Sequence, residues 1–355
     1  MALGSWFVLH RRQCGPCERR RPGTRRSTET VLIIGASSGI GKALALQYAQ
    51  RGATLFLVAR RQEQLERVAD QCRACLKKET EPSVGYGVFT LVADITQMED
   101  LVELEKFLGR QLRGTPESEH TAGEGGSLDT LVLCAGVLSV RPFAELAYGE
   151  TSSSLTQLSQ EYPFFENENT LRTQLSRVNS VTQSIFATNV YGLIHATQLT
   201  LPWLSRAPAG RIVVVSSAAG CTGTPTRTLY AASKHALHGF FDSLRIELAY
   251  TSRVTVCLVC PGTVATDLRR SAADLVVNPS VSSATSSSNS EATVTGSTQG
   301  KLSAEACAQR ILDAADNLWE RTVFIPRWYG WIPWLQFVHP TWLDYLAAKK
   351  YGLVK

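Results

Sequence analysis

The chain has 355 residues, of which 44% are hydrophobic, and this content supplies enough apolar side chains for a folded core. The length exceeds the usual domain of roughly 100–200 residues, but α/β folds often run longer, so we expect one domain with insertions. The net charge of +5 comes from arginines in the first 28 residues, which leaves the remainder close to neutral and argues against a nucleic-acid partner.

Residues 1–28 form a basic arm that contains one acidic residue, Glu18. This composition is typical of disordered arms and also of transit peptides, so mitochondrial targeting is an alternative reading. The apolar patch at residues 6–9 is too short to cross a bilayer.

The nine cysteines are an odd number with no secretory signal in front of them, which is typical of free thiols in a reducing compartment. No pair of histidines stands near them at the spacing of a zinc finger, so we expect no metal. The C-x-x-C pairs in question are Cys14/Cys17, Cys72/Cys75 and Cys257/Cys260.

A glycine-rich turn follows the first predicted strand, the buried run at residues 31–34. A helical pattern follows the turn from Lys42 to Arg51. Strand, glycine-rich turn and helix together present backbone N–H groups and a helix N-terminus to a pyrophosphate. We therefore expect a dinucleotide site that includes Gly35, Ser37, Ser38, Gly39, Ile40 and Gly41.

The next two strands carry charged residues at their ends. The strand at residues 54–59 is followed by Arg60 and Arg61, close to where NAD-binding proteins usually have an acid. An arginine there suits a 2′-phosphate, which predicts NADP(H). The strand at residues 88–93 ends at Asp94, whose carboxylate either caps the following helix or contacts adenine.

Two polar insertions are expected, at residues 113–127 and 148–180. The first reads as a solvated, glycine-rich loop. The second contains Tyr162, Phe164 and Phe165, which either line a substrate entrance or hold the insertion against the body.

Strand and helix patterns alternate along the chain, which predicts a doubly wound parallel sheet, the Rossmann fold. Ala135 and Gly136 follow the fourth strand and allow a close approach of the backbone, while Pro261 and Gly262 end the sixth. The remaining strands are predicted at residues 130–134, 211–216, 254–259 and 323–325.

The most distinctive stretch begins at Ser217, directly after the fifth strand. Tyr230 and Lys234 lie four residues apart, so they share one face of a helix that runs to about residue 250. An ammonium close to a phenol favours the phenolate and lowers its pKa from about 10, and the serine hydroxyl could hold a carbonyl oxygen. A preceding helix, expected from about Val181 to Leu204, carries Asn189, whose amide must serve either a structural helix kink or a site.

These motifs, in this order and spacing, resemble those of the short-chain dehydrogenases/reductases over about residues 30–270. The resemblance implies hydride transfer between a nicotinamide and a carbonyl or carbinol carbon. It implies Tyr230 as the catalytic acid/base, with Lys234 lowering its pKa and holding the nicotinamide ribose. It also implies that Ser217 orients the substrate oxygen and that Asn189 supports a water-linked proton relay. The cofactor contacts it implies are the glycine turn at the pyrophosphate, Arg60 at the 2′-phosphate, Asp94 at the adenine, Ala135 and Gly136, and Pro261, Gly262 and Thr266 on the nicotinamide side.

Two positions depart from the family pattern. Ile34 stands where the family usually has Thr, and Leu133-Cys134 stands where it usually has Asn-Asn. The side-chain bonds that those residues make between the central strands are therefore not expected, which could weaken cofactor binding. If the departure disables the site, the chain is instead a non-catalytic NADP(H)-binding regulator.

The end of the chain contains two further segments. Residues 274–300 are rich in Ser and Thr, are expected to be disordered, and fall where the family's substrate-covering loop lies; residues 301–326 complete the domain. In residues 327–355, aromatic and aliphatic side chains recur every three or four positions and lysines follow. This pattern predicts a monotopic helix or hairpin at a membrane surface, too short to span it; the alternative is a tail packed on the domain or on a partner subunit.

Together these features predict an NADP(H)-dependent carbonyl reductase or alcohol dehydrogenase. The tail favours a lipophilic ketone, steroid, sphingoid or retinoid substrate and a location on the cytoplasmic face of the endoplasmic reticulum. The alternatives are a cytoplasmic reductase of small carbonyls and the regulator named above. The family resemblance also makes a homodimer possible.

Overall fold

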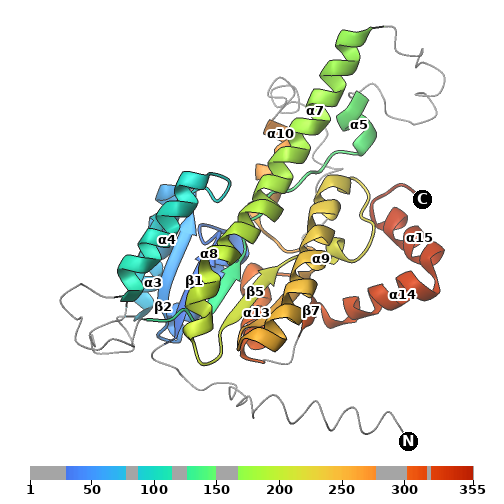
Figure 1. Cartoon of the computed structure of the whole chain (residues 1–355). Helices are drawn as coiled ribbons and strands as arrows, with labels where there is room; N and C mark the ends of the chain where they lie inside the picture. Colours follow the sequence, from blue (N-terminus) through green and yellow to red (C-terminus); the bar gives the residue numbers. More distant parts are fainter. Residues whose placement is uncertain are drawn as a thin grey trace, which may run out of the picture.

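The computed structural model describes residues 29–76, 87–113, 126–148, 167–276, 302–317 and 321–354. Seven strands in this part of the chain form one parallel sheet in the order β3-β2-β1-β4-β5-β6-β7 (Figure 1). The strands are β1 (Thr30–Ile34), β2 (Thr54–Ala59), β3 (Val88–Val92), β4 (Thr130–Leu133), β5 (Arg211–Val215), β6 (Thr255–Pro261) and β7 (Thr322–Ile325). The predicted doubly wound parallel sheet is confirmed.

Helices cover both faces of the sheet, which is why its strands are continuous apolar runs. Side chains of α2 (Gly39–Gln50), α3 (Gln62–Leu76) and α13 (Ala304–Asp316) pack on one face. Those of α4 (Met98–Arg113), α8 (Gly192–Arg206) and α9 (Thr228–Thr251) pack on the other. Each face therefore has its own buried core.

The order of the strands reverses between β1 and β4, because β1 leads to β2 on one side and β4 leads to β5 on the other. Ile34 pairs with both Val58 of β2 and Leu133 of β4, so these three strands end at the same level. Open α/β sheets bind ligands beyond the carboxyl ends of their strands at this reversal point. The fold thus indicates where to look for a site.

The helix that was expected to begin near Val181 begins thirteen residues earlier, as α7 (Glu168–Phe186), so that expectation is wrong. Asn167 caps it by accepting a hydrogen bond from the Asn169 backbone N–H at 2.9 Å. Most of α7 is exposed and only Val181 and Ile185 are buried. Leu171, Leu175 and Val178 extend the helical spacing of Val181 and Ile185 back into the segment that was expected to be a polar insertion.

Two short helices flank α7 in the fold, α5 (Phe143–Tyr148) and α10 (Ala273–Val276). Asp274 was expected to be the first residue of a disordered loop, but it lies in α10 with a buried side chain. The predicted start of that loop at residue 274 is therefore wrong. The Asp274 carboxylate accepts hydrogen bonds from the backbone N–H groups of Val140 and Arg141 at 2.7 and 2.8 Å.

Four predictions concern residues outside the described ranges. They are those for the basic arm, for residues 114–125, for Tyr162, Phe164 and Phe165, and for residues 277–301.

The C-terminal tail, residues 326–354, folds into η5 (Arg327–Trp331), α14 (Ile332–Val338) and α15 (Pro340–Lys350), shown in red in Figure 1. Pro333 and Pro340 stand in the first turns of α14 and α15, where a backbone N–H is not needed, and they divide the aromatic segment into short helices. The tail is tied to the domain by a hydrogen bond of 2.9 Å from Arg227 to the Tyr351 hydroxyl. None of the helices in the described ranges combines the length and the apolar character that crossing a bilayer requires.

Candidate active site

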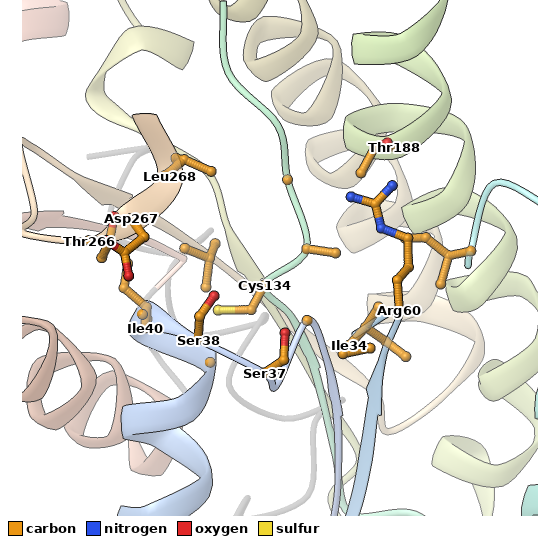
Figure 2. Close-up of a pocket in the computed structure, with 18 of the residues that line it drawn as sticks. Ile34, Ser37, Ser38, Ile40, Arg60, Cys134, Thr188, Thr266, Asp267 and Leu268 are labelled. Atoms are coloured by element: carbon orange, nitrogen blue, oxygen red, sulfur yellow. The ribbon is translucent and has the colours of Figure 1, made fainter. Parts of the chain in front are cut away.

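A cavity of about 510 Å³ lies beyond the carboxyl ends of the central strands. Figure 2 shows the Ser37 and Ser38 hydroxyls at its base, Arg60 on one side and the segment from Thr266 to Leu268 on the other. The predicted site residues that line it are Gly35, Ser37, Ser38, Gly39, Ile40, Gly41, Arg60, Asp94, Ala135, Gly136, Ser217, Tyr230, Lys234, Pro261, Gly262 and Thr266. Asn189 is the predicted residue that does not line it, although its neighbour Thr188 does.

The glycine turn is packed so closely that side chains are excluded from it. Gly35 has a φ of +92°, and a Cβ there would lie 2.6 Å from the backbone nitrogen of Ala135. A Cβ at Gly41 would lie 2.2 Å from the carbonyl oxygen of Gly35. The backbone at the start of α2 is therefore exposed to the cavity, as binding of a pyrophosphate requires.

Two arginines stand where β2 ends. The Arg60 guanidinium lies 3.5 Å from the Asp94 carboxylate, and about half of its side chain is exposed. Arg61 donates hydrogen bonds to the hydroxyls of Ser37 and Ser38 at 3.1 and 2.7 Å. Arg60 alone was predicted to contact the 2′-phosphate. The contact of Arg61 with the glycine turn depends on the tertiary structure. The mouth of the cavity therefore carries two positive charges.

Asp94 shapes the turn before α4 and also lines the cavity, while its predicted contact with adenine stays a prediction. One carboxylate oxygen accepts hydrogen bonds from the backbone N–H and the hydroxyl of Thr96, at 3.0 and 2.8 Å, and so shapes the turn before α4. The other oxygen faces Arg60, and the residue lines the cavity.

Ser217, Tyr230 and Lys234 come together as predicted. Tyr230 and Lys234 stand on the first turns of α9 and are buried, with the ammonium nitrogen 5.7 Å from the centre of the tyrosine ring. Lys234 donates to the carbonyl oxygen of Val215 at 3.0 Å. Ser217 caps the short helix η3 (Ala218–Gly220) by accepting a hydrogen bond from Ala219.

The expected lowering of the Tyr230 pKa is wrong for this arrangement. Burial raises the pKa of Tyr230 above its usual value, against the opposing effects of a hydrogen bond to Ser217 and the positive charge of Arg227. Burial also lowers the pKa of Lys234 to about 8, so this ammonium is mostly charged at pH 7 and loses its proton above about pH 8. The phenol therefore holds its proton at neutral pH.

Asn189 lies in a π-helical turn, η2 (Ala187–Tyr191), between α7 and α8, and its side chain is fully buried. It accepts a hydrogen bond from the backbone N–H of Val137 at 2.7 Å and donates to the Val137 carbonyl at 2.9 Å. It also donates to the Ser233 hydroxyl at 3.0 Å. Asn189 thereby joins the segment after β4 to α9, and Gly136 separates it from Lys234. Turns of this kind are frequent at functional sites.

Ile34 and Cys134 replace polar residues of the family pattern at the ends of the central strands. The backbone N–H of Cys134 donates to the Ile34 carbonyl at 2.9 Å, so the main chain continues the ladder without side-chain bonds. Burial raises the pKa of the Cys134 thiol to about 12, which keeps it neutral. The cavity thus has a neutral side chain at this point.

A second cavity, of about 710 Å³, adjoins the first and shares Ser217 and Tyr230 with it. The C-terminal tail forms much of its wall, and the Tyr329 ring packs so closely on Gly262 that a Cβ there would lie 2.6 Å from it. Sequence reasoning did not assign the tail to the site, because no local pattern indicates where a tail docks. The tail residues that line the cavity are Trp328, Tyr329, Trp331, Ile332, Leu335, Leu343, Leu346, Ala347, Lys350 and Tyr351.

Comparison with known proteins agrees with this geometry. The model of the short chain dehydrogenase family matches residues 29–159 and 168–275. An 11-beta-hydroxysteroid dehydrogenase-like protein of Arabidopsis thaliana, 4A, is 34% identical over 66% of this chain, a match that spans 61% of that protein. Another from the same plant, 11-beta-hydroxysteroid dehydrogenase-like 2, is 30% identical over 90% of this chain and 80% of its own length.

Solved structures share the fold. A short chain dehydrogenase/reductase from Burkholderia phymatum in complex with NAD superposes with a TM-score of 0.55 at 21% identity, over 83% of this chain and 88% of that chain. An alcohol dehydrogenase from Thermococcus sibiricus complexed with 5-hydroxy-NADP gives a TM-score of 0.55 at 20% identity, over 84% of this chain and 95% of that one. The glycine turn, the Ser217, Tyr230 and Lys234 cluster and these matches lead to one conclusion: the chain belongs to the short-chain dehydrogenase/reductase family and resembles its hydroxysteroid dehydrogenases.

Proposed function

We propose that this protein is an NADP(H)-dependent oxidoreductase that interconverts a carbonyl and a hydroxyl group on a lipophilic substrate. The observation that carries the proposal is that Ser217 and Tyr230 line both cavities. A reacting carbon placed beside these two hydroxyls would therefore face a nucleotide in the first cavity and have the rest of its molecule in the second.

The preference for NADP(H) is supported by charge. Arg60 and Arg61 follow β2, and both line the first cavity close to the glycine turn. Guanidinium groups bind phosphate through charge-assisted hydrogen bonds, whereas an acid at this position would repel the 2′-phosphate. The residues present thus fit a phosphorylated dinucleotide.

The lipophilic substrate is supported by the second cavity. Its volume of about 710 Å³ falls within the range of about 300–1,000 Å³ typical of sites for small organic ligands. Leu138 and Leu268 contribute to its wall from the domain, and Ile332, Leu335 and Leu343 contribute from the tail. Apolar burial can therefore orient a rigid ketone such as a steroid, the class named in the relatives, or a sphingoid or retinoid chain.

Each catalytic side chain has a step that its position suits. When bound, the nicotinamide supplies or accepts the hydride. Tyr230, which holds its proton at neutral pH, donates that proton to the substrate oxygen, and the Ser217 hydroxyl holds the same oxygen in place. Lys234 holds the nicotinamide ribose and supplies positive charge beside the phenol, and Asn189 fixes the backbone between them. Proton donation suits the reductive direction.

We further propose that the tail rests on a membrane surface, in line with a location on the cytoplasmic face of the endoplasmic reticulum. Away from the second cavity it presents aromatic rings that are at least 45% exposed, namely Trp334, Phe337, Trp342 and Tyr345. Lys349 and Lys350 stand at the end of α15, where they suit anionic headgroups. A lipophilic substrate could then pass from the bilayer to the cavity behind the tail. Homodimerisation through the same rings is the alternative.

The decisive experiment measures oxidation of NADPH against steroid ketones, 3-ketosphinganine, retinal and small aromatic carbonyls, with Tyr230→Phe protein in parallel. We expect turnover of at least one lipophilic carbonyl, and a decrease of about 10²–10⁴-fold in the variant with NADPH binding unchanged. Turnover of small carbonyls alone would favour a soluble reductase. Tight NADPH binding without turnover of any carbonyl would favour the regulator and refute the enzyme.

A further inference from the structure

The fold brings together a cluster of sulfur and nitrogen atoms next to the catalytic residues. The sulfur atoms of Cys221 and Cys260 and a ring nitrogen of His238 lie within 4.8 Å of one another. Cys221 follows η3, His238 stands on α9 and Cys260 is the penultimate residue of β6. Three elements that are distant in the sequence thus converge on one point.

We propose that Cys221, His238 and Cys260 bind a zinc ion, with the Ser216 hydroxyl as the fourth ligand. The Nε2 atom of His238 lies 3.8 Å from the Cys221 sulfur and 3.6 Å from the Cys260 sulfur. Zinc binds sulfur at about 2.3 Å and imidazole nitrogen at about 2.0–2.1 Å, so a sulfur and a nitrogen bound to one tetrahedral zinc lie about 3.5–3.6 Å apart. The two separations between cysteine sulfur and histidine nitrogen are therefore close to those of a zinc site.

The surroundings of the cluster suit a metal. The Ser216 hydroxyl lies 3.1 Å from the same His238 nitrogen, so an oxygen is available next to the imidazole as a fourth ligand. A Cβ at Gly220 would lie 2.9 Å from the imidazole and from the Ser216 oxygen, so glycine makes room for the group. Cys260 is buried while Cys221 and His238 are partly exposed, which leaves a route of entry from solvent. Two thiolates and one imidazole are soft ligands that favour zinc over magnesium or calcium.

Cys257 does not belong to this cluster, although it forms a C-x-x-C pair with Cys260. Side chains alternate along a strand, so residues three apart in β6 point to opposite faces. Cys257 accordingly packs in the core beneath α13, while Cys260 turns toward η3 and α9. The sequence predicted no metal because no histidine pair stands near the cysteines at zinc-finger spacing. The proposed site differs in that its ligands come from three separate elements.

The metal would hold the turn that positions Ser217. Binding releases the two thiol protons to solvent and links η3 to the end of β6 and to α9. This role is independent of the proposed function, because it can be measured as binding without any substrate.

The test uses the full-length protein, reduced with a phosphine and stripped with a chelator. Zinc per chain is measured after dialysis against limiting free zinc, and cobalt(II) serves as a spectroscopic probe through its thiolate charge-transfer absorption. We expect one tightly bound ion per chain, a higher melting temperature with zinc, and a cobalt–thiolate band. Cys221→Ser and His238→Gln should each lose the band and bind less than a tenth as much zinc at the same free concentration.

Two control variants keep the test specific. Cys75→Ser removes a partly exposed thiol from another C-x-x-C pair, and Cys257→Ala removes the other cysteine of β6; both should retain the ion and the band. NADPH binding by each variant verifies that it is folded. Absence of a cobalt–thiolate band in the reduced wild type, or its persistence in Cys221→Ser, would overturn the proposal. A Cys221–Cys260 disulfide that persists under reductant would do the same.

Discussion

Replacing Lys234 by methionine should make the protein more stable at neutral pH while abolishing its activity. Methionine has a similar shape and no charge, so Lys234→Met removes the buried ammonium. Burial lowers the pKa of this group from 10.5 to about 8, which corresponds to roughly 3 kcal/mol of destabilisation when it is charged. The hydrogen bond from its nitrogen to the Val215 carbonyl offsets about 1 kcal/mol of that.

The expected net gain for Lys234→Met is therefore about 2 kcal/mol at pH 7, or roughly 3 °C in melting temperature for a chain of this length. The gain should depend on pH in a defined direction. Between about pH 8 and 10.5 the unfolded chain binds more protons at Lys234 than the folded protein does, so wild-type stability rises with pH across this window. The advantage of the variant should then shrink as the pH rises, vanish near about pH 9.5 and become a deficit of about 1 kcal/mol by pH 10.5, because the wild type regains the whole desolvation cost of roughly 3 kcal/mol.

The assay is thermal unfolding of both proteins by circular dichroism from pH 7 to 10.5, taken as the difference at each pH. Lys106→Met, at an exposed position on α4, serves as the control for the loss of a lysine side chain. A variant that is less stable than wild type at pH 7, or a difference that does not change with pH, would refute the reasoning.

Four further predictions follow from the site and the tail. Arg61→Asp should weaken NADPH binding relative to NADH by about tenfold or more, since a charged hydrogen bond contributes about 1.5–3 kcal/mol; equal loss for both cofactors would place the 2′-phosphate elsewhere. Asn189→Ala leaves the buried N–H and carbonyl of Val137 without their partner and should lower the free energy of unfolding in urea by about 2–6 kcal/mol. A urea midpoint equal to that of the wild type would contradict this. Leu335→Trp narrows the second cavity and should raise KM for a steroid-sized ketone more than for a small carbonyl, whereas a uniform change would argue against that cavity as the substrate site. A double Trp334→Ser, Phe337→Ser variant should no longer sediment with anionic liposomes, with Tyr250→Ser as control, and continued sedimentation would exclude these rings as the anchor.

Local pattern was sufficient for the parallel sheet and for most of the nucleotide cavity. Buried strands are short apolar runs, and the glycine turn between β1 and α2 is continuous in sequence, so both can be recognised without tertiary contacts. The same is true of Tyr230 and Lys234, because four residues are one helical turn.

Local pattern failed where burial and long-range contact decide. Apolar residues recur at helical spacing from Leu171 onward, but Leu171 and Leu175 are not buried and stand among polar residues, so the segment near Glu168 was interpreted as a polar insertion. The pKa of Tyr230 was expected to fall because of Lys234, but burial, which depends on every element packed around the phenol, raises it.

The sequence by itself indicated the family, the doubly wound parallel sheet and most of the residues that line the first cavity. These features rest on contacts between neighbours in the chain and on the alternation of strand and helix. Only the tertiary structure decided that the C-terminal tail closes a second cavity over Tyr230, that Arg61 reaches the glycine turn, and that Cys221, His238 and Cys260 meet. Those contacts join segments far apart in the chain, and their formation depends on how the helices pack on the sheet rather than on any local spacing.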